Sequence, residues 1–142
     1  MPEHRAQSLL GFDFGEKRIG IAVGQSLTGS VTPLVTLNAV NQQPDWAGIS
    51  RVINEWQPDL LVVGLPLHMD GTEQDITQRV KRFGNQLKGR YNLPVEFVDE
   101  RLSSYDAEQI LREQGKKRSD KKDIDKLAAA LFLQSWLENN VQ

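Results

Sequence analysis

The sequence predicts an α/β fold with one mixed five-stranded sheet and helices on both of its faces. Three apolar segments rich in β-branched residues come first, and a glycine-containing turn separates the first two. Later apolar segments alternate with stretches of helical periodicity, an order typical of parallel strands joined by right-handed crossovers. The predicted order of elements is therefore βββαβαβαα.

The first three strands are predicted to form an antiparallel meander. Residues 9–14 and 19–25 have the composition of strands, and residues 15–17 form the turn between them. Residues 31–40 are apolar and rich in β-branched side chains, which predicts a third strand. Pro33 lacks a backbone donor, so it indicates an irregularity or an edge position in that strand.

The chain then alternates between helices and strands. Pro44 and Pro58 are placed to bound a first helix, and residues 60–63 form a continuous apolar run typical of a strand buried on both faces. Residues 95–98 are predicted to be the fifth strand. Apolar residues at helical spacing mark the first two helices: Trp46, Ile49, Ile53 and Trp56, then Ile76, Val80, Phe83 and Leu87.

Two further helices are predicted to close the chain. Ser103 or Ser104 can cap the first of them, which contains apolar residues over positions 107–111. The last helix is predicted to run from about Ile124 to Glu138.

The composition is that of a globular protein. The 142 residues are 39% hydrophobic and 25% charged, which fits a single domain over residues 1–142. There is no cysteine, the N-terminus lacks the apolar run of a secretory signal, and no apolar stretch reaches the length of a membrane span. We therefore expect a soluble, cytoplasmic protein. The formal charge of −2 argues against coating of nucleic acid by bulk charge but is compatible with a local basic groove.

Asp13 is the first candidate for chemistry, because it lies between two phenylalanines in the predicted central strand. An ionised carboxylate there is costly unless something compensates its charge, and a metal cation does so. The alternative is an Asp at a strand end that accepts hydrogen bonds from the backbone of the following turn. The sequence leaves both interpretations open.

Glu100 is the second candidate, within Asp99-Glu100-Arg101 at the end of the fifth predicted strand. Ligands of open α/β sheets usually bind at the carboxyl ends of strands. The alternative is a solvated surface triplet, or a Glu–Arg ion pair of little energetic consequence.

Asp125 is the third candidate, in the first predicted turn of the last helix. An Asp there is often only a cap or a partner of the helix dipole. Ala128 and Ala129 share its face, however, and leave room for close approach to the sheet. Residues 116–122 hold five cations and one anion, which is either a solvated loop or, beside a carboxylate cluster, an arm that contacts phosphates.

Three carboxylates from three separate elements suit phosphodiester hydrolysis. Two hard cations about 4 Å apart can activate water and stabilise the leaving oxygen. Hard cations take oxygen ligands, so Asp and Glu rather than Cys or His would hold Mg²⁺ or Mn²⁺. No histidine base is then needed, and His68 is more simply a surface residue of a turn. Neither a P-loop nor a dinucleotide-binding motif is present.

Four segments of the chain form an ordered set of motifs. They are Phe12-Asp13-Phe14-Gly15 with Lys17-Arg18-Ile19-Gly20, Val63-Gly64-Leu65-Pro66-Leu67 with Met69-Asp70-Gly71-Thr72, Asp99-Glu100-Arg101-Leu102-Ser103, and Asp125 with Ala128-Ala129. Over almost the whole chain they resemble the YqgF (RuvX) family of Holliday-junction-resolvase-like proteins, also described as pre-16S rRNA nucleases. Two departures are His68, where relatives commonly have Asn, and Asp123, where a Lys is frequent.

The resemblance implies an RNase H-like fold, with Asp13, Glu100 and Asp125 as the catalytic acids and metal ligands. It implies in-line attack by metal-activated water, which leaves a 5′-phosphate and a 3′-hydroxyl. The cations expected to hold the phosphates are Arg18, Arg101, Lys116, Lys117, Arg118, Lys121 and Lys122.

The leading functional hypothesis is an endonuclease that processes the 5′ end of pre-16S rRNA, with the ribosome or its precursor as a partner. A DNA junction resolvase is the alternative enzyme, and its two symmetric cuts require a two-fold dimer. The sequence has no obvious dimer helix, which favours a monomer and an RNA substrate over a homodimer and branched DNA. A third alternative is a non-catalytic nucleic-acid-binding factor in ribosome assembly or transcription, which the presence of all three acids disfavours.

Overall fold

The computed structural model describes residues 7–66, 75–99 and 121–140 of the chain. Its elements are β1 (Ser8–Phe14), β2 (Arg18–Gln25), β3 (Ser30–Asn38), α1 (Trp46–Trp56), β4 (Leu60–Leu65), α2 (Thr77–Tyr91), β5 (Val95–Asp99) and α4 (Lys121–Asn140). The helix predicted over residues 107–111 lies outside the described ranges. Within those ranges, no helix is both long enough and apolar enough to cross a membrane.

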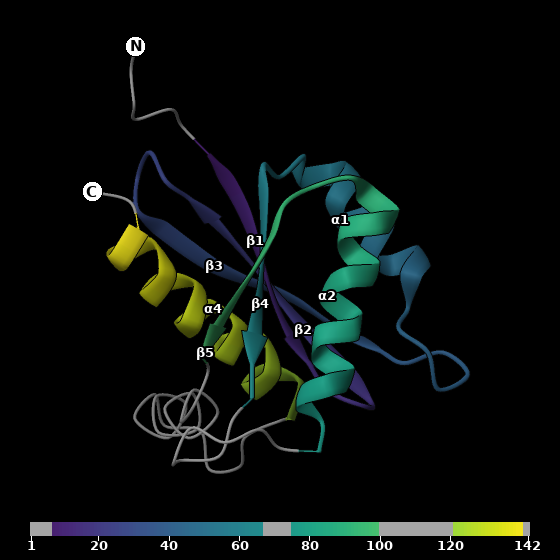
Figure 1. Cartoon of the computed structure of the whole chain (residues 1–142). Coiled ribbons are helices and arrows are strands. Elements are labelled where there is room, and N and C mark those ends of the chain that lie inside the picture. Colours follow the sequence, from purple (N-terminus) through teal and green to yellow (C-terminus); the bar gives the residue numbers. More distant parts are fainter. Residues whose placement is uncertain (1–6, 67–74, 100–120, 141–142) are drawn as a thin grey trace.

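The strands form one mixed five-stranded sheet in the order β3-β2-β1-β4-β5, with the first strand at its centre (Figure 1). β1 pairs antiparallel with β2, and β2 pairs antiparallel with β3. β4 runs parallel to β1, and β5 runs parallel to β4. The predicted meander followed by parallel strands is therefore confirmed.

The edge strand β3 is irregular at Pro33, as its sequence predicted. The register shifts between Ile21 and Ala22 of β2, which pair with Val35 and Pro33 of β3. A proline cannot donate to the ladder and is tolerated at a bulge or on an edge strand.

Two predicted boundaries were wrong. β3 ends at Asn38 rather than at residue 40, because residues 40–43 form a separate tight turn. α4 begins at Lys121 rather than at Ile124, so Lys121 and Lys122, at the end of the basic run, belong to the helix.

Helices cover both faces of the sheet, as predicted (Figure 1). Alternate residues of the central strand supply the two cores: Leu10 and Phe12 pack with α1 and α2, whereas Leu9 packs with α4. β4 is likewise buried on both sides from Leu60 to Val63, which accounts for its continuous apolar run.

α4 approaches the sheet closely because a glycine faces it. A Cβ atom on Gly20 of β2 would lie 2.3 Å from both the carbonyl carbon and the carbonyl oxygen of Asp125. No side chain fits at that distance, so only glycine allows the helix to lie here. Ala128 and Ala129, one turn further along α4, are fully buried, as the small-residue pattern predicted.

Candidate active site

Asp13 lies on the face of the sheet that α4 covers. It is the penultimate residue of β1, is half-buried, and pairs with Gly20 of β2. Residues directly opposite each other in an antiparallel pair point to the same face, with Cα atoms about 5 Å apart. Because Gly20 faces the backbone of Asp125, Asp13 and Asp125 meet at the same end of the sheet on the same face.

Asp125 is held in place by Arg18, the first residue of β2. Arg18 Nε donates a hydrogen bond of 2.7 Å to Asp125 Oδ2, across 107 positions of sequence. The two side chains are 27% and 21% exposed, so the carboxylate is partly desolvated and the guanidinium compensates its charge. The predicted phosphate-binding cation Arg18 therefore contacts one of the predicted acids.

The capping interpretation of Asp125 is not supported by the geometry. α4 begins at Lys121, and the acidic residue in its first turn is Asp123 rather than Asp125. The carboxylate of Asp125 accepts from Arg18, not from the backbone donors of the helix start. Asp123 instead lies 3.7 Å from Lys126 Nζ in an ordinary intrahelical ion pair.

Several predicted residues lie where the structure gives no side-chain account. Glu100 and the cations Arg101, Lys116, Lys117 and Arg118 are outside the described residues. Lys121 and Lys122 are described only as backbone in the first turn of α4. Of the three predicted acids, the described part of the chain therefore includes Asp13 and Asp125, which lie at the same end of the sheet.

Carboxylate oxygens at this site are the donors that Mg²⁺ and Mn²⁺ prefer. Within residues 7–66, 75–99 and 121–140, no group of three or more His, Cys, Asp or Glu side chains is assembled. Asp13 and Asp125 provide two carboxylates, and β5 ends at Asp99, the residue immediately before Glu100. β1 and β5 run parallel to β4, so the carboxyl ends of all three strands lie at the same end of the sheet.

Gly20 is part of the first motif, but its role in setting the position of Asp125 was not predicted. The available signal was a glycine inside a strand, which often marks a close backbone approach. Gly24, four residues further along β2, also faces α4, where a Cβ atom would lie 3.2 Å from Leu133 Cδ2. Gly20 and Gly24 together let α4 pack closely against β2.

Comparisons with known proteins agree with this fold. A family model, RuvX, described as "Holliday junction resolvase", matches residues 7–139. The chain is 52% identical over 134 residues to the "Putative pre-16S rRNA nuclease" of Aeromonas salmonicida, covering 94% of this chain and 96% of that protein. It is 50% identical over 134 residues to the protein of the same name from Pseudomonas putida, covering 93% and 95%.

Solved structures resemble the chain in fold. T. thermophilus RuvC in complex with a Holliday junction substrate gives a TM-score of 0.54 at 15% identity, over 95% of this chain and 97% of that one. Fowlpox virus resolvase in complex with Holliday junction DNA gives 0.61 at 12% identity, over 95% and 99%. These likenesses confirm the predicted RNase H-like fold, and the family match with the close relatives shows that this chain belongs to the RuvX family.

Proposed function

We propose that this protein is a metal-dependent endonuclease that hydrolyses phosphodiester bonds and processes the 5′ end of pre-16S rRNA in the cytoplasm. The observation that carries the proposal is the meeting of Asp13 and Asp125 at one end of the central strand. A structural ion pair rarely requires two acids from distant segments on one partly exposed face. A site for a divalent cation does require such acids.

The residues fit a divalent metal. Asp13 is half-buried and the Asp125 side chain is 21% exposed, so both carboxylates are positioned by the fold while solvent still reaches the site. The Asp125 carboxylate already has a cationic partner in Arg18. Mg²⁺ or Mn²⁺, when bound, supplies Lewis acidity and an activated water for phosphodiester hydrolysis, and two such ions suit this reaction.

Glu100 completes the proposed set of metal ligands. β5 directs Glu96 toward α4, since Trp136 Nε1 donates a hydrogen bond of 3.0 Å to Glu96 Oε1. Val98 packs against the core beneath α4. Glu96 and Val98 therefore lie on the face of β5 toward α4, and Glu100 follows two residues after Val98 in the sequence.

In the proposed mechanism, the three acids hold the metal while nearby cations bind the phosphates on either side of the scissile bond. Arg18, which lies beside Asp125, is proposed for this role together with Arg101 and the basic residues 116–122. We propose ribosomal RNA rather than branched DNA as substrate, because the relatives named for pre-16S rRNA share about half of their sequence with this chain. A monomer that acts on the ribosome precursor fits this substrate.

A DNA junction resolvase is the second candidate, favoured by the family description and by the solved resolvase structures. The two functions are separated by incubating the purified protein with labelled precursor rRNA leader and with a four-way DNA junction, each with Mn²⁺, Mg²⁺ or EDTA. We expect metal-dependent cutting of the RNA. Paired symmetric cuts in the junction, with the RNA intact, would favour the resolvase, and cleavage of neither would contradict both.

Removing Arg18 is expected to tighten metal binding. The guanidinium donates to Asp125 Oδ2, so a cation that binds this carboxylate must compete with Arg18 for it. Loss of a partly buried ion pair of about 1 kcal/mol corresponds to roughly fivefold in affinity. Isothermal titration of Mn²⁺ into Arg18→Ala should therefore give a dissociation constant about three- to tenfold lower than wild type.

The matched control is Arg51→Ala, which removes the same charge from an exposed position of α1. It should bind Mn²⁺ like the wild type. Equal or weaker Mn²⁺ binding by Arg18→Ala would show that Arg18 and the metal do not share Asp125.

A further inference from the structure

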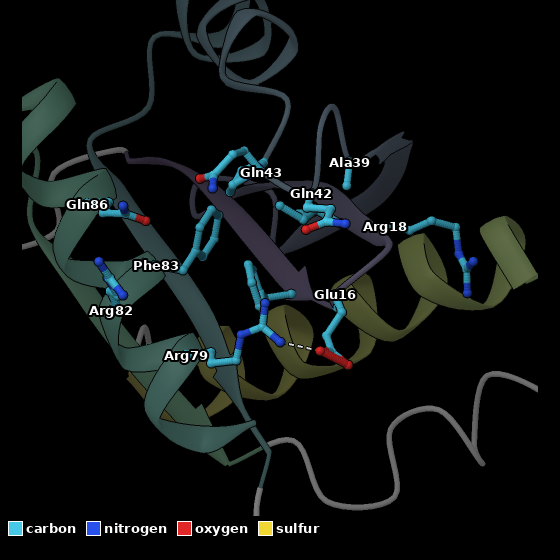
Figure 2. A pocket seen from close by; sticks show the side chains of 13 residues that line it. Glu16, Arg18, Ala39, Gln42, Gln43, Arg79, Arg82, Phe83 and Gln86 are labelled. Carbon is cyan, nitrogen blue, oxygen red and sulfur yellow. Dashed lines mark hydrogen bonds and ion pairs between the residues drawn. The ribbon is translucent and has the colours of Figure 1, made fainter. Parts of the chain in front are cut away.

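A polar pocket lies on the sheet face opposite α4. It has a volume of about 180 Å³ and is enclosed by the β1–β2 turn, residues 39–44 and α2 (Figure 2). Its floor is aromatic, with the Phe14 and Phe83 rings 4.8 Å apart between centroids. The polar groups around it include Arg79, Arg82, Gln42, Gln43 and Gln86.

The pocket adjoins the proposed active site. Phe14 follows Asp13 directly in β1, and successive residues of a strand point to opposite faces. The connecting turn borders both sites, since Gly15, Glu16 and Arg18 line the pocket while Arg18 also binds Asp125. Figure 2 shows the Arg18 side chain directed toward α4, away from the other arginines. A nucleic-acid strand that crosses this turn can contact both sites.

The chemistry of the pocket matches a nucleotide. Arg79 forms an ion pair with Glu16 (Figure 2), whereas Arg82 has no hydrogen bond or ion pair within the part of the chain that the structure describes. Guanidinium groups bind phosphate oxygens, and the amides of three glutamines both donate to and accept from base edges. The volume of about 180 Å³ is below the roughly 300 Å³ typical of pockets for drug-sized ligands, so it suits a single base, with the sugar and phosphate at the rim beside Arg82, rather than a whole cofactor.

Two residues with positive φ lie in the turn at the rim of the pocket. Val40 and Gln43 exchange backbone hydrogen bonds of 2.8 and 3.0 Å, which leaves Asn41 and Gln42 as a two-residue turn. Both have positive φ, 52° and 63°, as in a type I′ turn, where the second position strongly favours glycine. Gln42 keeps a side chain there despite this cost, and that side chain lines the pocket.

We propose that this pocket binds one unpaired nucleotide of the substrate, close to the bond that is cut. Arg82 takes the phosphate and the glutamine amides read the base edge, so the substrate must be single-stranded where it passes the β1–β2 turn. Only unpaired bases expose these edges, which is how proteins commonly recognise RNA. This inference rests on the proposed nuclease function and adds a requirement for unpaired substrate.

The test is fluorescence anisotropy of the full chain in EDTA, so that binding is measured without cleavage. The probes are a labelled single-stranded RNA dodecamer and the same RNA annealed to its complement. The variants are Arg82→Ala and Gln42→Gly, with Arg51→Ala on α1 as the charge-matched control. We expect both pocket variants to raise the dissociation constant for the single strand by about five- to tenfold, and that for the duplex by less than about twofold.

Thermal unfolding separates binding from folding. Glycine relieves the positive φ of residue 42, so Gln42→Gly should melt at the wild-type temperature or higher while it binds the single strand more weakly. Wild-type affinity of both variants for the single strand, or equal losses on single strand and duplex, would overturn the proposal. Failure of the nuclease function has a different signature: the wild type would cleave neither RNA nor junction in the presence of metal.

Discussion

Asp13→Asn is expected to lower the rate of phosphodiester cleavage by about a thousandfold or more while leaving the protein folded. The amide has nearly the same shape as the carboxylate but carries no charge, so it fills the half-buried site without holding a divalent cation. Metal ions stabilise the transition state by several kcal/mol, and about 4 kcal/mol corresponds to three orders of magnitude in rate. Single-turnover cleavage with saturating Mn²⁺ measures the loss.

The control for Asp13→Asn is Glu55→Gln, the same change of charge at an exposed position of α1. It should cleave at the wild-type rate, and both variants should unfold at temperatures close to the wild type. If Asp13→Asn kept activity within tenfold of wild type at saturating metal, Asp13 would not be a metal ligand of the reaction.

Gly20→Ala is expected to lower both stability and activity. The added methyl group would lie 2.3 Å from the backbone of Asp125, so α4 must move away from β2 or the strand must distort. Overpacking against a backbone that cannot rotate away costs about 3 kcal/mol, which lowers the melting temperature by roughly 10 °C. Because α4 carries Asp125, the displacement should also reduce cleavage, and denaturant titration with a cleavage assay measures both.

Gly89→Ala provides the matched comparison. Gly89 lies in α2, and a Cβ atom there would meet no atom within 4 Å. Alanine in a helix interior is favoured over glycine, so this variant should be more stable by about 0.5–1 kcal/mol and fully active. A melting temperature of Gly20→Ala equal to or above that of Gly89→Ala would mean that α4 does not rest on β2 at Asp125.

Much of the fold could be predicted because its signals are local. The turn at residues 15–17, the apolar run of β4 and the proline of β3 each follow from backbone or packing rules that act within a few residues. The start of α4 is harder to predict, because a run of lysines is typical of an exposed segment although lysine is also a good helix former. The end of β3 was missed because its turn uses Asn41 and Gln42 without a glycine.

The candidate site was predicted in part. Asp13 and Asp125 were identified by residue type and position, and the structure places them together. The Arg18–Asp125 contact joins residues 107 positions apart, and no periodicity in the sequence encodes such a pairing. The pocket beside it draws its polar groups from a strand turn, a loop and a helix, which only the folded chain brings together. The roles of Asp13, Glu100 and Asp125 as metal ligands stay predictions.

Asp13 at the end of β1, together with Glu100 and Asp125, is expected to hold the catalytic metal. The most direct measurement is anomalous diffraction from crystals of the protein soaked with Mn²⁺. We predict anomalous peaks at the carboxylates of Asp13, Glu100 and Asp125, with Arg18 released from Asp125 Oδ2. Peaks elsewhere, or none, with the Arg18–Asp125 ion pair intact at saturating Mn²⁺, would contradict the account.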